Sequence, residues 1–94
     1  MNERIVALDV GDARIGVAVS DASRHIASPV EVSHRVGFGP DVKREQEISR
    51  RYDPTLILSG LPLNLNGTEG PQAAKVRLFC QQLEKVGLVV YYLD

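Results

Sequence analysis

The sequence of 94 residues has few of the features that mark several classes of protein. Its single cysteine, Cys80, excludes an internal disulfide and fits a reducing compartment. No apolar run is long enough for a membrane-spanning helix, and residues 1–4 lack the basic region and apolar core of a signal peptide. We therefore expect a cytoplasmic protein that is not inserted in a membrane.

Neither positive nor negative charge is in excess. The chain has 11 Lys and Arg against 12 Asp and Glu, a net charge of −1, so it lacks the global basic signature of a nucleic-acid-binding protein. Basic residues gather locally around a predicted helix, at Lys43, Arg44, Arg50 and Arg51, in a pattern that is typical of a solvated helix face. The apolar content of 44% and the length predict one globular domain over residues 1–94.

The hydrophobic pattern predicts an α/β fold with a mixed sheet. Strands are expected at residues 4–9, 14–20, 27–33, 55–60 and 88–93, and helices at 41–52 and 72–86. Asp41 is expected to cap a mostly exposed first helix, whereas Val76, Phe79, Cys80 and Leu83 should form the buried face of the second. The continuous apolar run of the last strand is typical of a strand covered on both faces.

Two aspartates stand at strand ends. Asp9 closes the first predicted strand and Asp94 the last, so right-handed crossovers can bring both to one edge of the sheet. Carboxylates held together favour a hard cation such as Mg²⁺ or Mn²⁺, and a two-metal site can activate water for phosphodiester cleavage. The alternative interpretation is that Asp9 and Asp94 are solvated and bind no metal.

The loop at residues 60–71 joins a strand to a helix. Its free backbone N–H groups and the helix dipole favour a phosphate. The same residues also fit ordinary turn chemistry, with Thr68 as the helix cap and Asn64 and Asn66 in left-handed turn positions.

Residues 8–21, 27–29 and 60–72 together resemble the YqgF/RuvX-like family, whose members are described as Holliday junction resolvases and pre-16S ribosomal RNA nucleases. The resemblance implies a ribonuclease-H-like fold with a five-stranded sheet in the order β-β-β-α-β-α-β. It also implies a divalent-metal-dependent endonuclease that cleaves structured nucleic acid, either precursor 16S rRNA during ribosome biogenesis or branched DNA.

The family pattern assigns a role to individual residues. Asp9 would be the catalytic acid that binds the metals, Arg14 would contact a backbone phosphate, and Gly11 and Gly16 would keep the turn close to the site. Asp94 aligns with the start of the last-strand motif, as a further metal ligand. The signature loop would add residues near the site, which are Asn64, Gly67, Thr68 and Glu69.

Further acids of the family pattern would follow Asp94. The resemblance therefore implies a domain that is incomplete at its C-terminus and lacks its C-terminal helical part. We expect this chain to be inactive by itself, to expose apolar surface, and to self-associate, for example as a homodimer.

Two other classes of function stay open. A strand-end aspartate beside a glycine turn also occurs in ATP-binding domains of the actin, heat-shock ATPase and sugar-kinase type. A noncatalytic module could instead bind nucleic acid or a ribosome-assembly partner through the basic residues of the first helix.

Overall fold

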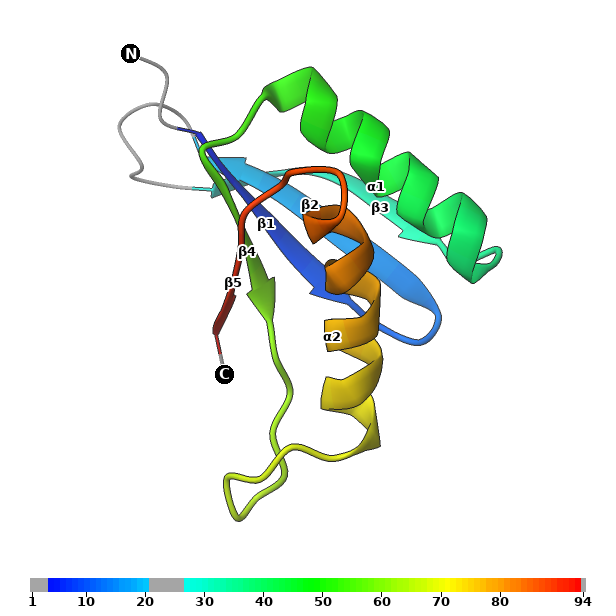
Figure 1. Ribbon diagram of the computed structural model, residues 1–94, viewed down its shortest axis with the longest axis vertical. Helices are drawn as coiled ribbons and strands as arrows, with labels where there is room; N and C mark the ends of the chain where they lie inside the picture. Colours follow the sequence, from blue (N-terminus) through cyan, green and yellow to red (C-terminus); the bar gives the residue numbers. More distant parts are fainter. Residues whose placement is uncertain (1–3, 21–26, 94) are drawn as a thin grey trace.

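The computed structural model describes residues 4–20 and 27–93. The elements follow the predicted β-β-β-α-β-α-β order (Figure 1). Their bounds are β1 Ile5–Val10, β2 Arg14–Ser20, β3 Ala27–His34, α1 Phe38–Tyr52, β4 Leu56–Gly60, α2 Pro71–Glu84 and β5 Val90–Leu93.

The five strands form one mixed sheet in the order β3-β2-β1-β4-β5, which confirms the predicted fold class. β1 lies in the centre, antiparallel to β2 and parallel to β4. β3 pairs with β2 in antiparallel fashion, and β5 pairs with β4 in parallel fashion at the other edge. Because β1 and β4 are parallel neighbours, their carboxyl ends open on the same edge of the sheet.

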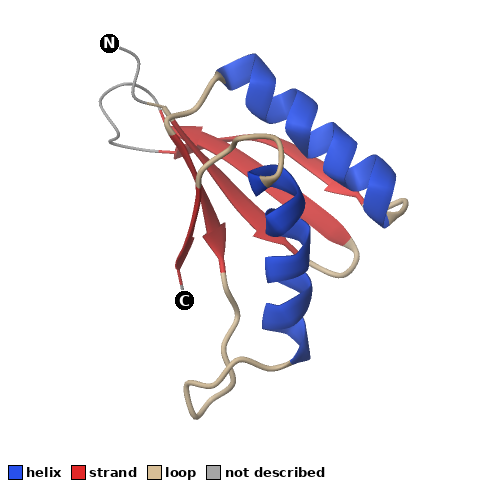
Figure 2. Cartoon of the chain, viewed as in Figure 1, coloured by secondary structure: helices blue, strands red, loops and turns tan. Residues whose placement is uncertain are grey.

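Both helices pack against one face of the sheet (Figure 2). Alternate residues of β1, namely Val6, Leu8 and Val10, point into this core because a strand turns successive side chains to opposite faces. The predicted buried face of α2 is confirmed, since its four residues are at most 1% exposed. Cys80 is among them, so this cysteine is a core residue.

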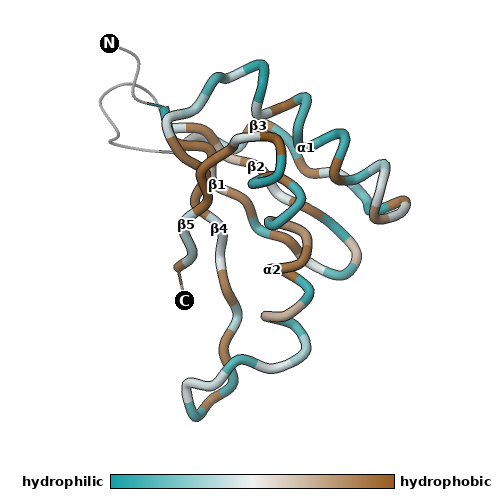
Figure 3. Tube along the Cα trace, in the orientation of Figure 1, coloured by the Kyte–Doolittle hydropathy of each residue, from teal (hydrophilic) through white to brown (hydrophobic). Residues whose placement is uncertain are grey.

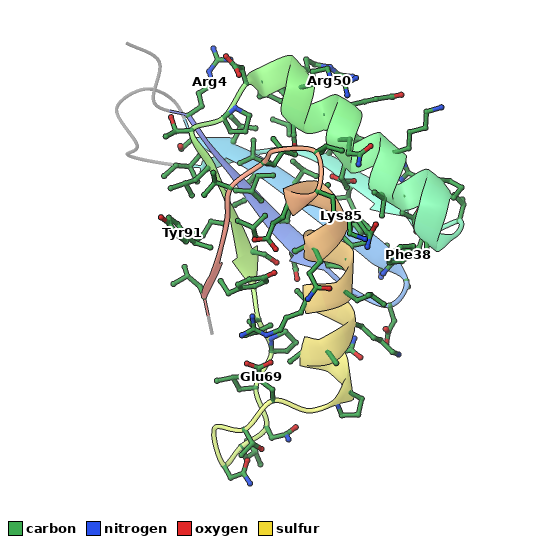
Figure 4. All side chains as sticks on the ribbon, in the orientation of Figure 1. Arg4, Phe38, Arg50, Glu69, Lys85 and Tyr91 are labelled. Carbon is green, nitrogen blue, oxygen red and sulfur yellow. The ribbon has the colours of Figure 1, made fainter. Side chains whose placement is uncertain are left out.

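The opposite face of the sheet carries no helix within the described residues. Val32, Tyr91 and Leu93 are 66%, 58% and 54% exposed there, and Figure 4 shows Tyr91 projecting from β5 away from α2. The prediction of a last strand covered on both faces is therefore wrong for this part of the chain. β5 is an edge strand, and its apolar residues are covered only on the side of α2.

The first helix differs from the prediction in its start and in its buried face. α1 begins at Phe38, so Asp41 lies inside the first turn and does not cap the helix from outside. Three of its five buried residues are polar or charged; the five are Asp41, Val42, Glu45, Ile48 and Ser49. Figure 3 shows the mixed colouring of this helix, in contrast to the brown strands beneath it.

The remaining differences are shifts of one to two residues at element ends. Thr68 does not cap α2, because Gly70 occupies the N-cap position and no side chain caps the helix there. Asn64 and Asn66 do not adopt left-handed backbone angles; Asp53 is the non-glycine residue that does so in the described ranges. No helix in residues 4–20 and 27–93 has the length and apolar character needed to cross a membrane.

Candidate active site

Asp9 lies near the carboxyl end of the central strand β1, with its side chain exposed. Its neighbours Leu8 and Val10 are buried, so the alternation of the strand turns Asp9 to the face that the helices leave open. The residue lines a cleft of about 480 Å³ that is completed by Val10, Gly11, Gly60, Leu61, Pro62, Gln72 and Leu93. One carboxylate therefore faces an open cleft between the first turn, the signature loop and the ends of α2 and β5.

A second depression joins Asp9 to the basic residue of the same motif. It measures about 410 Å³ and is lined by Asp9, Gly11, Ala13, Arg14, Gly16 and Val32. Asp9 pairs with Gly16 across the β1–β2 hairpin, and a Cβ at Gly16 would lie 3.8 Å from the Cβ of Asp9. A side chain there would fill the space beside the carboxylate, so glycine keeps this side of Asp9 open.

The turn after Asp9 is compact. The Gly11 N–H donates to the Arg14 carbonyl at 2.9 Å, and a Cβ at Gly11 would approach that oxygen to 3.0 Å. A side chain at residue 11 would therefore crowd this carbonyl, and glycine fits the close approach. The structure thus places Asp9, Gly11, Arg14 and Gly16 together around one depression.

The helix α2 holds one side of this turn. Lys75 lies 3.5 Å from the carboxylate of Asp12, and both side chains are largely exposed. A hydrogen bond from Gln72 and the charge of Lys75 lower the pKa of Asp12. Asp12 is therefore engaged with α2, which leaves Asp9 as the acid that faces the cleft.

The start of α1 holds the other side of the turn through Arg35. This guanidinium donates to the Gly11 carbonyl at 3.0 Å and to the Asp41 carboxylate at 2.9 Å, and the Arg35 N–H donates to the Ala13 carbonyl at 2.9 Å. The guanidinium also lies 5.3 Å from the centre of the Phe79 ring. Arg35 therefore connects the turn that follows Asp9 to α1 and to the core.

Asp41 is fully buried and has several partners. Besides Arg35, its oxygens accept hydrogen bonds from the N–H groups of Val36 and Gly37 and from the Arg44 guanidinium. Burial alone would raise the pKa of Asp41, but the hydrogen bonds from Arg35, Val36 and Gly37 outweigh it and lower the pKa. The carboxylate is charged and part of the framework.

The signature loop is built by its own polar residues. The Asn64 N–H donates to the Thr68 carbonyl at 2.8 Å and the Gly67 N–H donates to the Asn64 carbonyl at 2.9 Å. The Thr68 hydroxyl lies 2.6 Å from the Asn66 side-chain oxygen. Gly67 has a φ of 84°, which favours glycine at this position.

The end of the loop is attached to α2 and β5. Glu69 accepts two hydrogen bonds of 2.7 Å from the Arg77 guanidinium, and this guanidinium lies 4.6 Å from the centre of the Tyr92 ring. The bidentate contact with Arg77 lowers the pKa of Glu69. Burial, followed by the charges of Cys80 and Glu84, raises the pKa of Tyr92 to about 12.

The predicted site residues thus divide into two groups. Asp9, Gly11, Arg14 and Gly16 lie around the cleft and the adjoining depression. The four predicted loop residues do not line either of them, because the cleft is lined by the base of the loop at Gly60, Leu61 and Pro62. They shape and anchor the loop instead. Asp94 lies outside the described residues.

The site also uses residues that the sequence motifs did not single out. Gln72 and Leu93 line the cleft, Arg35 holds the turn, and Arg77 anchors the loop. Of these four residues, only Gln72 had an indication of its role in the sequence, because it lies at the predicted start of the second helix. Arg35 and Arg77 make contacts that no local pattern specifies.

The carboxylate of Asp9 is a hard oxygen donor suited to Mg²⁺ or Mn²⁺. Within the described part of the chain, no group of three or more His, Cys, Asp or Glu residues is arranged to hold a metal ion. Among the described residues, Asp9 is therefore a single candidate ligand, and they do not form a complete metal site.

One of the four basic residues of α1 is engaged in contacts within the protein. The Arg44 guanidinium is engaged with Asp41 and with the His34 carbonyl, whereas Lys43, Arg50 and Arg51 are exposed. Figure 4 shows Arg50 pointing outward from the helix. Arg44 is thus part of the framework around Asp41.

The fold is similar to that of RuvC from Thermus thermophilus, with a TM-score of 0.69 at 16% sequence identity, over 96% of this chain and 63% of that chain. A Bacteroides thetaiotaomicron protein with an actin-like ATPase fold also matches, with a TM-score of 0.61 at 10% identity, over 98% of this chain and 33% of that chain. These likenesses define a ribonuclease-H-like fold.

Comparison of the sequence identifies a family within this fold class. The family described as "RuvX: Holliday junction resolvase" matches residues 3–94, and the chain belongs to the RuvX family. A relative from Caldanaerobacter subterraneus, named "Putative pre-16S rRNA nuclease", is 45% identical over 88% of this chain and 60% of its own length. A relative of the same name from Clostridioides difficile is 42% identical over 100% of this chain and 67% of its own length. The chain thus spans about 60% of the length of the first of these relatives.

Proposed function

We propose that Asp9 is a metal-binding catalytic acid of an endonuclease that hydrolyses phosphodiester bonds in structured nucleic acid. The observation that carries the proposal is the exposed Asp9 carboxylate on the central strand, open to a cleft, in a member of the RuvX family. The relatives' names point to precursor 16S rRNA and the family description points to four-way DNA junctions. A nuclease for precursor rRNA would act in the cytoplasm.

The residues around the cleft support distinct parts of this activity. Asp9 would hold a divalent ion, which supplies Lewis-acid stabilisation and an activated water when bound. Arg14 lies on the rim of the adjoining depression and would bind a backbone phosphate. The open space at Gly16 would let the sugar-phosphate backbone approach the carboxylate.

Further ligands would come from outside the described residues, beginning with Asp94. A two-metal site needs several carboxylates, and the described cleft has one. We therefore expect the 94-residue chain alone to cleave poorly or not at all. Relatives that this chain covers to about 60% of their length have additional residues that could supply such ligands.

The test uses Asp9→Asn in the complete gene product. Cleavage of a four-way DNA junction and of a precursor 16S rRNA is measured with Mg²⁺ and with Mn²⁺, together with Mn²⁺ binding by calorimetry. We expect Asp9→Asn to lower cleavage at least a hundredfold and to weaken Mn²⁺ binding, because it removes a charged ligand.

The matched control is Asp53→Asn, which makes the same change at an exposed acid that does not line the cleft. Asparagine also tolerates the left-handed backbone of residue 53, where φ is 46°. The proposal is wrong if Asp9→Asn cleaves as well as Asp53→Asn. Tight ATP binding without cleavage of either substrate would instead support the actin-like alternative.

A further inference from the structure

His34 lies directly opposite Arg14 in the sheet. The two residues pair in the antiparallel register of β3 with β2 (Figure 1). The Arg35 N–H donates to the Ala13 carbonyl at 2.9 Å, so the neighbouring pair is joined by a backbone hydrogen bond. Because the two kinds of pair alternate along an antiparallel ladder, Arg14 and His34 form a pair without backbone hydrogen bonds, with Cβ atoms about 5 Å apart.

Both side chains lie on the sheet face that the helices leave open. Ile15 is 1% exposed and points into the core, so its neighbour Arg14 turns to the opposite face. His34 turns to the same face, because residues that pair directly across a ladder share a face. Both residues are exposed, so the pair presents a guanidinium and an imidazole side by side.

The next row of side chains on this face contains Asp9. Asp9 pairs with Gly16, and Gly16 pairs with Val32, so these residues cross three neighbouring strands. Gly16 and Val32 stand two positions from Arg14 and His34 along their strands, which separates the two rows by about 7 Å. Successive phosphates of a nucleic-acid backbone have a spacing of the same order. A backbone with one phosphate at Asp9 can therefore place the next at the Arg14 row.

The charges on this face are available to two different ligands. Asp9 and Arg14 line the same depression of about 410 Å³, yet Arg14 forms no ion pair with any acid in the described part of the chain. The neighbouring acids are already paired, since Asp12 contacts Lys75 and Asp41 contacts two guanidiniums. The Arg14 guanidinium is thus available to an anion, and the Asp9 carboxylate to a cation.

The end of β3 that carries His34 is held by its backbone. The Arg44 guanidinium of α1 donates to the His34 carbonyl at 3.4 Å. The next residue, Arg35, is bonded through its N–H to Ala13 and through its guanidinium to Gly11. These contacts use the backbone of His34 and not its imidazole, so the ring is presented from an anchored strand end and its N–H is left for a ligand.

We propose that Arg14 and His34 together bind the phosphate next to the scissile phosphate of the nucleic acid. The guanidinium supplies charge and the imidazole supplies a ring N–H donor, and both groups can contact phosphate oxygens. The scissile phosphate lies one row away, at Asp9. This inference rests on the proposed function, and it directs the cleaved strand along β2 and β3.

The experiment uses the complete gene product and a synthetic form of the substrate that it cleaves, a four-way DNA junction or a precursor 16S rRNA segment. Binding is titrated at several salt concentrations in the Asp9→Asn background, so that cleavage does not interfere. The variants are Arg14→Ala, His34→Ala and His34→Arg. The matched control is Arg50→Ala, the same change at an exposed arginine that points outward from the last turn of α1 (Figure 4).

We expect Arg14→Ala and His34→Ala each to weaken binding about fivefold at low salt. Arg14→Ala should also lower the slope of the salt dependence by about one, because it removes one charged phosphate contact. His34→Arg should bind at least as tightly as the parent protein, since it keeps a donor and adds charge. Arg50→Ala should match the parent protein in affinity and in salt slope.

A modified substrate tests which phosphate is bound. It carries an uncharged methylphosphonate in place of the phosphate next to the cleaved bond, in separate versions for the two sides of that bond. On one version, Arg14→Ala and His34→Ala should no longer weaken binding, because the contact that they remove is already lost. A methylphosphonate a few nucleotides away should leave the effect of both variants unchanged.

The outcomes separate the two proposals. If the parent protein cleaves neither substrate, or if Asp9→Asn cleaves as well as its control, the proposed function fails. If cleavage depends on Asp9 but His34→Ala binds as tightly as the parent protein, the assignment of His34 is wrong and the proposed function stands. Weaker binding by His34→Ala that is the same on every version of the substrate would assign the residue to the fold and overturn the phosphate contact.

Discussion

Glu45 is expected to make the stability of the protein depend on pH. The side chain is 1% exposed on the face of α1 that packs against the core, and neither carboxylate oxygen has a hydrogen-bond partner among the described residues. Burial raises its pKa from 4.5 to about 7, and the charges of Glu31 and Asp41 act in the same direction. Arg44 opposes the increase.

The sign of the effect follows from proton binding. Between pH 4.5 and about 7, folded Glu45 keeps a proton that the unfolded chain has released, so the free energy of unfolding falls as pH rises through this window. The difference between 4.5 and about 7, at about 1.4 kcal/mol for each pH unit, gives a loss of about 3 to 4 kcal/mol, of which about 3 kcal/mol falls above pH 5. This is a large part of the stability of a small domain.

The perturbation is Glu45→Gln, which imitates the protonated side chain at every pH. Urea unfolding of both proteins is measured at about pH 5 and about pH 8. Wild type should lose about 3 kcal/mol more than Glu45→Gln between these conditions, because the other titrating groups are common to both proteins. Glu47→Gln, an exposed position of the same helix, is the control and should follow wild type. Parallel pH profiles for wild type and Glu45→Gln would refute the reasoning, since they would mean that Glu45 titrates as it does in water.

Two further predictions concern the framework and the open sheet face. Asp41→Asn should lower the free energy of unfolding by about 3 kcal/mol in urea titrations, because it removes the buried charge that pairs with the partly buried Arg35; an effect below about 1 kcal/mol would contradict this. The 94-residue chain should self-associate through the sheet face that includes Val32. Val32→Lys should therefore shift sedimentation profiles toward monomer, whereas Val36→Lys, outside the sheet, should not. A monomer for all three proteins at high concentration would count against this.

The fold could be predicted where local patterns decide the structure. β2 has the predicted bounds, and the four-residue apolar face of α2 is buried as expected, because strand and helix periodicity are properties of neighbouring residues. The solvent exposure of one face of β5 could not be predicted. Whether Tyr91 and Leu93 are covered depends on which element lies over that face, and an apolar run does not contain this information.

The start of α1 was missed because its stabilising contacts are not those of a simple cap. Asp41 fits the N-cap pattern, but it lies inside the first turn of the helix. From there its carboxylate accepts hydrogen bonds from the N–H groups of Val36 and Gly37, which precede the helix. The polar residues on the buried face of α1 could not be predicted either. Glu45 and Ser49 carry polar atoms into the interface, and a search for apolar spacing does not find them.

The residues around Asp9 could be predicted because one contiguous motif carries them. Arg14 and Gly16 follow Asp9 within one hairpin, so a short turn is enough to bring them together. The family resemblance assigns the loop residues to the same site, and in the structure Asn64 and Thr68 bond to each other. The contact from Arg35 to Gly11 joins residues 24 positions apart, and only the folded sheet brings them together.

The turn that follows Asp9 is held from both helices, and this has a consequence for the site. Arg35 ties the Gly11 carbonyl to α1, while Gln72 and Lys75 hold Asp12 at the start of α2. A carboxylate that binds a divalent ion must keep its position when the ion is absent, since neighbouring negative charge would otherwise displace it. Two independent contacts on one short turn meet this requirement without using the Asp9 side chain itself. The Asp9 oxygens are thereby left open to the cleft, while Arg35 anchors the backbone of the turn beside them.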